Sequence, residues 1–113
     1  MSVQPVQLFA PQQLTNAATI YYTSTNILTR IDKLTFTNQD SSAHTVTIYL
    51  VPAAGSPVAA NLITKTYQIP AGATYNCPDV VGHILGAGGT LQMLADANTE
   101  VTAFGAGTQI SAT

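Results

Sequence analysis

Apolar and polar residues alternate with a period of two along much of the chain, most clearly in the stretch 30–52. Two alternating runs, 34–37 and 45–50, flank the polar segment 38–42. Such alternation, with threonine and other β-branched residues between the apolar ones, is typical of half-buried strands. The polar residues between the runs are suited to a turn. The pattern predicts two strands that pair as a β-hairpin and form the centre of a sheet.

Further short runs with strand character recur along the chain, separated by turn residues. They lie at 17–23, 27–37, 61–69, 74–77, 90–95, 100–105 and 109–111. Within 27–37 the apolar positions change phase, which predicts a β-bulge or bend near 30–33. Seven or eight short strands with turns at regular spacing predict an all-β fold, an antiparallel β-sandwich or jelly roll. A closed barrel has the same periodicity and stays the alternative.

One segment, 78–85, predicts a short helix. Its sequence is PDVVGHIL, in which proline suits the first helical position and aspartate suits the first turn. The apolar residues Val80, Val81, Ile84 and Leu85 would form a single stripe. Two turns of helix are not stable alone, so this helix is expected to close one end of the sandwich.

The N-terminal segment 1–14 is predicted to be an extended arm, and 15–113 a single β-sandwich domain. Pro5 and Pro11 disfavour a helix or a central strand in the arm. Because it carries Leu8 and Phe9, the arm either folds back on its own domain or lies on a neighbour, and both alternatives stay open. A chain of 113 residues is long enough for one core but not two.

The composition changes the picture mainly through its lack of charge. Only 7% of the residues are charged, against about 25% in typical proteins. A neutral, threonine-rich exterior suits a protein in a large assembly, although an ordinary small β domain is the alternative. The only cationic side chains are Arg30, Lys33 and Lys65, too few for nucleic-acid binding. No apolar run is long enough to span a membrane, and the N-terminus does not resemble a signal peptide, so synthesis in the cytoplasm is expected.

Residues that carry chemistry are few and scattered. Cys77 is the single cysteine and is expected to be buried. His44 and His83 each follow an aspartate by four residues, but the ligand number for a structural zinc site is missing. Asp96 and Glu100 flank a turn, where they would make only a weak calcium site. We therefore predict no enzyme activity, no cofactor and no metal.

Four segments together resemble a known family. They are IYYTST at 20–25, RIDKLTFTNQDSSAHTVTIYLVP at 30–52, IPAGATYNCPDVVGHILGAGGTLQMLA at 69–95 and VTAFGAGTQIS at 101–111. In these segments the chain is similar to small β-sandwich virion structural proteins of tailed bacteriophages, of the capsid decoration, stapling or cement type. The resemblance implies a virion protein on the outer capsid surface that bridges neighbouring major capsid proteins as a dimer or trimer. Head-tail adaptors and tail components share such folds and are an alternative.

Candidate partner-contacting residues follow from exposure and chemistry rather than from a motif. Tyr21 and Tyr22 are successive, so one ring is expected in the core and the other facing a partner. The exposed tip between the two central strands is polar. The candidates are Val3, Val6, Leu8, Phe9, Tyr21, Tyr22, Asp40 and His44. A carbohydrate- or receptor-binding module is the competing interpretation, because exposed tyrosines, with Tyr49 and Tyr75 as further examples, also suit a sugar-binding face.

Overall fold

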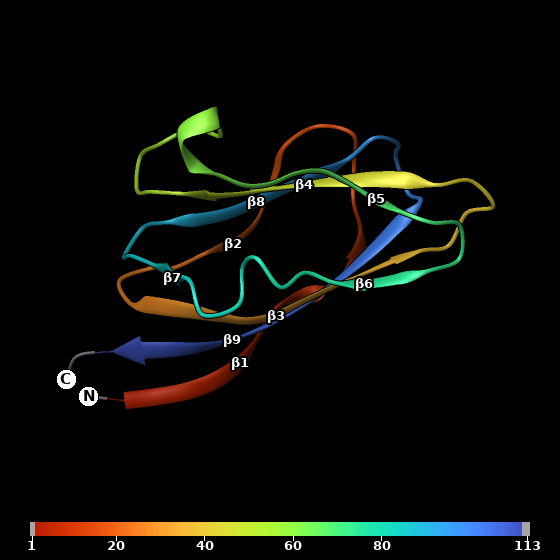
Figure 1. Ribbon diagram of the computed structural model, residues 1–113. Helices are drawn as coiled ribbons and strands as arrows, with labels where there is room; N and C mark the ends of the chain where they lie inside the picture. The colour runs from red at the N-terminus through yellow and green to blue at the C-terminus, as the bar shows by residue number, and fades with distance from the viewer. Residues whose placement is uncertain (1, 112–113) are drawn as a thin grey trace.

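Two antiparallel sheets meet face to face across one hydrophobic core in the computed structural model, which describes residues 2–111 (Figure 1). The first sheet contains, in spatial order, β1 (Ser2–Gln13), β9 (Val101–Ser111), β3 (Leu28–Asn38) and β6 (Thr74–Asn76), with the short β7 (Ile84–Leu85) also beside β3. The second contains β2 (Thr19–Thr23), β8 (Thr90–Ala95), β4 (His44–Val51) and β5 (Leu62–Ile69). One 3-10 turn, η1 (Ala59–Asn61), precedes β5.

The order of the strands identifies the sandwich as a jelly roll. The order β1-β9-β3-β6 in one sheet corresponds position by position to β2-β8-β4-β5 in the other. Each strand therefore has a sequence neighbour at the same position of the opposite sheet, which is the result of rolling up one long hairpin. The prediction of an all-β sandwich or jelly roll is confirmed.

The predicted pairing of the two central strands is wrong. Both strands form, as β3 and β4, but β3 pairs with β9, β6 and β7, whereas β4 pairs with β5 and β8. The polar segment between them crosses from one sheet to the other. The apolar side chains, Leu34 and Phe36 on one side and Val46 and Ile48 on the other, are fully buried in the shared core. Alternation shows that each strand has a buried face. It does not identify the partner strand, because neighbours in one sheet and strands in opposite sheets have the same alternation.

The predicted bulge in the long third strand is confirmed. The register of β3 against β9 shifts between Ile31 and Lys33, so Asp32 is the extra residue. Arg30 Nε donates to Asp32 Oδ1 at 2.9 Å, and Thr108 Oγ1 donates to Asp32 Oδ2 at 2.7 Å. These contacts lower the pKa of the Asp32 carboxyl, with the Thr108 hydroxyl the larger cause.

The predicted helix at 78–85 is wrong. The segment is a turn followed by β7, with Val80 and Leu85 buried but Val81 and Ile84 more than half exposed. Its backbone bonds to the bulged strand: the Gly82 amide donates to the Ile31 carbonyl at 2.8 Å, and the Ile31 amide donates to the His83 carbonyl at 2.9 Å. Gly82 has φ +86°, a turn conformation that ends any helix. Within residues 2–111, no helix has the length and apolar character needed to cross a membrane.

The N-terminal arm is an integral strand of the first sheet, so it folds back on its own domain. β1 pairs with β9 from Ser2 opposite Ser111 to Gln13 opposite Thr102. Leu8 and Phe9 are at most 7% exposed, and Leu14 after the strand is fully buried. Phe9 lies over Gly105, where an added Cβ would stand 2.5 Å from its ring. Because the core includes these side chains, removal of 1–14 is expected to unfold the domain rather than free it.

Candidate functional site

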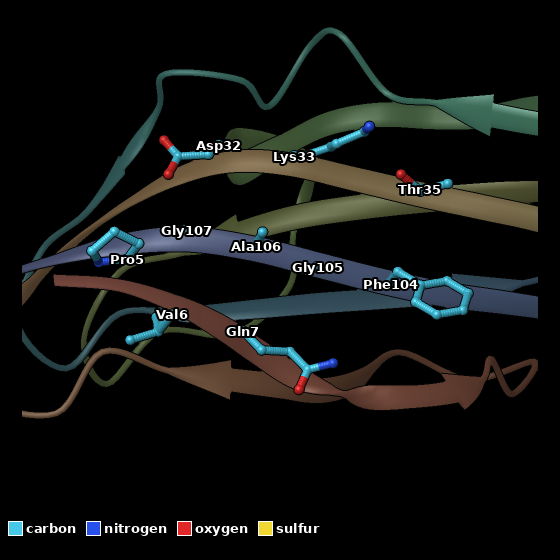
Figure 2. Close-up of a pocket in the computed structure, with 10 residues that line it drawn as sticks. All are labelled: Pro5, Val6, Gln7, Asp32, Lys33, Thr35, Phe104, Gly105, Ala106 and Gly107. Carbon is cyan, nitrogen blue, oxygen red and sulfur yellow. The ribbon is translucent and has the colours of Figure 1, made fainter.

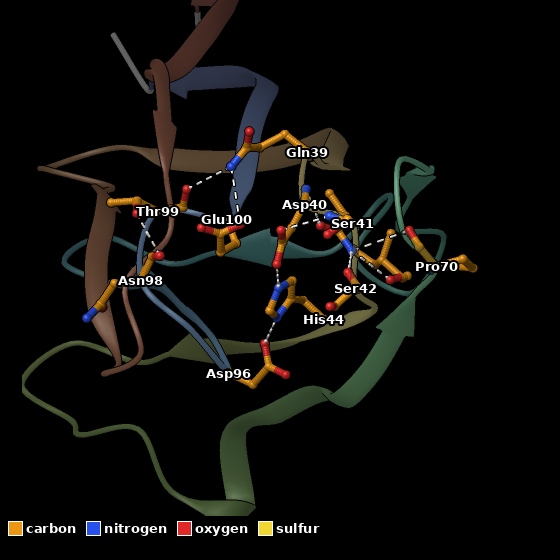
Figure 3. Close-up of polar contacts among 12 residues, drawn as sticks. Gln39, Asp40, Ser41, Ser42, His44, Pro70, Asp96, Asn98, Thr99 and Glu100 are labelled. Carbon is orange, nitrogen blue, oxygen red and sulfur yellow. Dashed lines mark hydrogen bonds and ion pairs between the residues drawn. The ribbon is translucent and has the colours of Figure 1, made fainter.

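A cluster of ionisable side chains lies at one end of the sandwich, where two connections cross between the sheets (Figure 3). His44, the first residue of β4, has its Nε2 2.8 Å from Asp40 Oδ2 and its Nδ1 2.8 Å from Asp96 Oδ1. Asp40 comes from the β3–β4 connection, and Asp96 directly follows β8. Glu100, just before β9, completes the cluster, since ligand atoms of Asp40, His44 and Glu100 all lie within 4.8 Å of one another.

Buried Asn38 fixes the loop that carries Asp40. Its side chain is fully buried and donates to the carbonyls of Ser42 at 2.8 Å and Ile69 at 3.0 Å. Its Oδ1 accepts the Asp40 amide at 3.0 Å. Asn38 thus links Asp40 and Ser42 of the polar connection to the adjacent end of β5, and the Asp40 carboxylate is directed toward His44.

The cluster is anionic apart from the imidazole. Hydrogen bonding to Asp40, and next to Asp96, raises the pKa of His44. The same bond from His44, followed by the Ser41 amide, lowers the pKa of Asp40. Gln39 Nε2 donates to Glu100 Oε2 at 3.3 Å. The spacing of four residues does bring Asp40 to His44, although the sequence favoured ordinary turn residues here, and the fold adds two carboxylates from more than fifty residues further along the chain.

The outer face of the first sheet carries a shallow groove of about 520 Å³ (Figure 2). It crosses three strands, and its lining includes Pro5 and Gln7 of β1, Phe104 and Ala106 of β9, and Lys33 and Thr35 of β3. Phe104 is 45% exposed in a central strand, between the buried Ala103 and Gly105. An aromatic ring on the solvent side of a sheet is suited to contact a partner.

The edge strands carry features that oppose the addition of another strand. β1 has Pro5 and Pro11, which have no amide hydrogen. In β5 the register shifts around Lys65 and Thr66, and Thr66 has φ 45°. β6 and β7 are three and two residues long, and β2 is five residues long with a register shift. Prolines, lysines, bulges and short strands all protect sheet edges from pairing.

The candidate partner-contacting residues separate into exposed and buried groups. Val3 is 59% exposed and Val6 is half-buried, whereas Leu8 and Phe9 pack in the core. Leu8 and Phe9 are thus structural in this fold. Asp40 and His44 are half-buried in the ionisable cluster.

Tyr21 and Tyr22 do not divide into one core ring and one free ring. A register shift between Ile20 and Tyr22 lets both rings pack partly against the core. Tyr21 lies 5.7 Å from Phe9 between ring centroids, and the Tyr22 hydroxyl is 2.7 Å from Thr29 Oγ1.

The side chains of Cys77, Asp79 and Tyr75 all contact neighbouring side chains of the sandwich. Cys77 is 1% exposed, as expected, and its Sγ is 3.5 Å from Thr64 Oγ1. Asp79 accepts a hydrogen bond from Thr64 at 3.1 Å and is not paired with His83. Tyr75 of β6 stacks on Tyr67 of β5, in the opposite sheet, with ring centroids 3.9 Å apart, so packing between the sheets accounts for it better than a sugar-binding face.

Comparison with known proteins adds information about the fold. No protein-family model matches the chain, and no curated protein is similar to it. Among solved structures, it is similar to a chain of infectious bursal disease virus, Gx strain, with a TM-score of 0.56 and 13% identity over 96% of this chain and 32% of that one. It is also similar to a chain of the Bacillus endospore appendages, described as a novel family of disulfide-linked pili, with a TM-score of 0.56 and 15% identity over 99% and 90% of the two chains.

These similarities establish a shared β-sandwich fold and no more, because the identities are low. The chain spans about a third of the length of the viral chain and nearly the whole of the appendage chain. Sequence reasoning did not single out Phe104, although its position between small residues in a strand was visible. It also considered Asp96 and Glu100 only as a pair beside a turn, because nothing in their spacing connects them with His44.

Proposed function

We propose that the protein is a virion structural protein that decorates or staples a capsid by bridging neighbouring major capsid proteins. The supporting observation is the exposed outer face of the first sheet, where Phe104 lies in a groove that also contains the charged side chains of Asp32 and Lys33. The similarity of nearly the whole chain to a domain-sized part of a viral chain is consistent with this role. A tailed-bacteriophage origin, suggested by the sequence resemblance, is part of the proposal.

The contact is made through this face rather than through a sheet edge. Strand addition needs a row of free amide and carbonyl groups, and the edge strands are interrupted by proline, bulges or short length. A face contact needs an exposed apolar anchor with polar side chains around it, and Phe104 provides the anchor, with Gln7, Lys33 and Thr35 in the same groove. Many weak copies, as dimers or trimers, would together hold the shell.

The test compares two surface variants in binding to capsids that lack the protein. Phe104→Ser removes the aromatic anchor, and Val81→Ser, at a residue 53% exposed on the segment before β7, is the matched control. We expect both variants to fold, Phe104→Ser to lose most capsid binding and Val81→Ser to bind normally. Normal occupancy of the Phe104→Ser variant would contradict the proposed face, and failure of the native protein to bind capsids would contradict the function.

The second candidate is a repeating subunit of a fibre. It is favoured by the match to the endospore appendage chain, which this chain covers almost completely. A fibre linked by disulfides would need an accessible cysteine, and the chain's single cysteine, Cys77, is buried. Electron microscopy of the concentrated protein separates the two: filaments from the protein alone support the fibre, whereas discrete particles support decoration.

A further inference from the structure

The cluster around His44 has the composition and geometry of a cation site. We propose that Asp40, His44 and Glu100 bind one divalent transition-metal ion, with Zn²⁺ the best fit, and that Asp96 orients the imidazole. Ligand atoms of the three residues lie within 4.8 Å of one another, so small side-chain movements would bring them to the distance of about 2 Å at which Zn²⁺ binds nitrogen and oxygen. This site is separate from the face proposed for capsid binding.

The imidazole of His44 is already held as a metal-binding histidine is held. Its side chain is only 12% exposed, and Asp96 Oδ1 is 2.8 Å from Nδ1. A carboxylate that accepts a hydrogen bond from the N–H of one ring nitrogen fixes the orientation of the ring and leaves the other nitrogen to bind a metal. That other nitrogen, Nε2, faces Asp40 Oδ2 at 2.8 Å, with Glu100 close by.

The charge balance of the cluster points to a cation independently. Three of the chain's five acidic residues, Asp40, Asp96 and Glu100, gather around one imidazole. Among residues 2–111, the only arginine or lysine in an ion pair is Arg30, which pairs with Asp32 at the bulge. With the imidazole neutral, as metal binding through Nε2 requires, the three carboxylates carry about −3, and a divalent ion would reduce this to about −1.

The donor set selects the kind of ion. One imidazole nitrogen with two carboxylates suits Zn²⁺, which accepts nitrogen and oxygen ligands and can complete its shell with water. Ca²⁺ and Mg²⁺ prefer oxygen ligands throughout, and Ca²⁺ needs six or more. The ion would join the β3–β4 connection to the start of β9, and so link the two crossings between the sheets.

The experiment is calorimetric titration of the full chain with ZnCl₂, and with CaCl₂ in parallel. We expect one saturable Zn²⁺ site per chain with much weaker Ca²⁺ binding. His44→Gln and Glu100→Gln should abolish binding, and Asp96→Asn should weaken it roughly 10- to 100-fold. His83→Gln is the matched control, because His83 also follows an aspartate by four residues but is exposed and unpaired with it, and it should bind normally.

Circular dichroism tests whether each variant is folded. Glu100→Gln disturbs the loop least, because its side-chain oxygen can still accept the hydrogen bond from Gln39. The proposal is overturned if the native chain shows no saturable Zn²⁺ binding. It is also overturned if folded His44→Gln and Glu100→Gln variants bind as well as the native chain, or if His83→Gln removes the site.

Discussion

The contact between Phe9 of β1 and Gly105 of β9 gives the strongest test of how the first strand joins the fold. Phe9 is 7% exposed and packs on Tyr21. Truncation of a buried phenylalanine costs about 3–5 kcal/mol, from lost burial and the cavity left behind. We expect Phe9→Ala to lower the free energy of unfolding by about 4 kcal/mol. With a urea m-value of about 2 kcal/mol/M, the unfolding midpoint should fall by roughly 2 M.

A double-mutant cycle links this loss to the neighbouring glycine. A Cβ on residue 105 would stand 2.5 Å from Cε1 of Phe9 and 3.1 Å from Cδ2 of Leu34. Gly105→Ala alone should therefore cost about 1–3 kcal/mol through overpacking. In the Phe9→Ala background the ring is absent, so the same change should cost about 1–2 kcal/mol less.

Gly107→Ala is the control for this cycle. A Cβ there would meet the backbone carbonyl oxygen of Arg30 at 2.6 Å, a contact that Phe9→Ala leaves in place. Its cost should be the same in both backgrounds. A loss below about 1 kcal/mol for Phe9→Ala would mean that β1 lies outside the cooperative unit. Equal costs of Gly105→Ala in the two backgrounds would mean that Phe9 does not cover Gly105.

Three further predictions concern single residues. Asn38→Ala should lower stability by about 2–4 kcal/mol in thermal melts, because several buried backbone groups lose their partner, and a loss under 1 kcal/mol would contradict the anchoring role. Cys77 should react with a thiol reagent only after denaturation, and fast reaction of the folded protein would show that it is accessible. The pKa of the Asp32 carboxyl, followed by NMR, should lie below 3.8, because Thr108 and Arg30 stabilise its charged form. Because the pKa of Asp32 is lower in the folded state, the charged carboxylate should stabilise the fold above about pH 4, and this contribution should disappear as the pH falls through the folded-state pKa. A folded-state pKa of 3.8 or higher would refute this prediction.

The buried faces of the strands could be predicted from sequence, but their neighbours could not. Alternation correctly assigned Leu34, Phe36, Val46 and Ile48 to the interior, and the change of phase in β3 correctly placed the bulge. The same alternation suits strands that lie side by side and strands that face each other across a core. The choice depends on the partner β9, which lies more than sixty residues further along the chain.

The wrong prediction of a helix at 78–85 also has its cause in distant parts of the chain. Val80, Val81, Ile84 and Leu85 have the spacing of a helical stripe, but the bulged strand β3 offers backbone groups that a turn at Gly82 satisfies. Tertiary hydrogen bonds thus outweighed a weak local preference.

The candidate site shows the same limit. Asp40 and His44 are close in sequence and their pairing was visible. Asp96 and Glu100 reach them only because β8 pairs with β4 and the chain then crosses to β9.

The position of β9 between β1 and β3 has a consequence for how the protein is made. Within residues 2–111, β1 is the first strand and β9 the last, and β9 is the only strand that pairs with β1. During synthesis the first sheet therefore cannot close until Val101–Ser111 has left the ribosome. Until then Leu8 and Phe9 have no covering strand, and exposed apolar side chains of this kind favour aggregation. If translation is stalled before β9 is released, the nascent chain should be sensitive to protease. Release of β9 should protect β1 and β9 at the same time, because the two strands pair with each other.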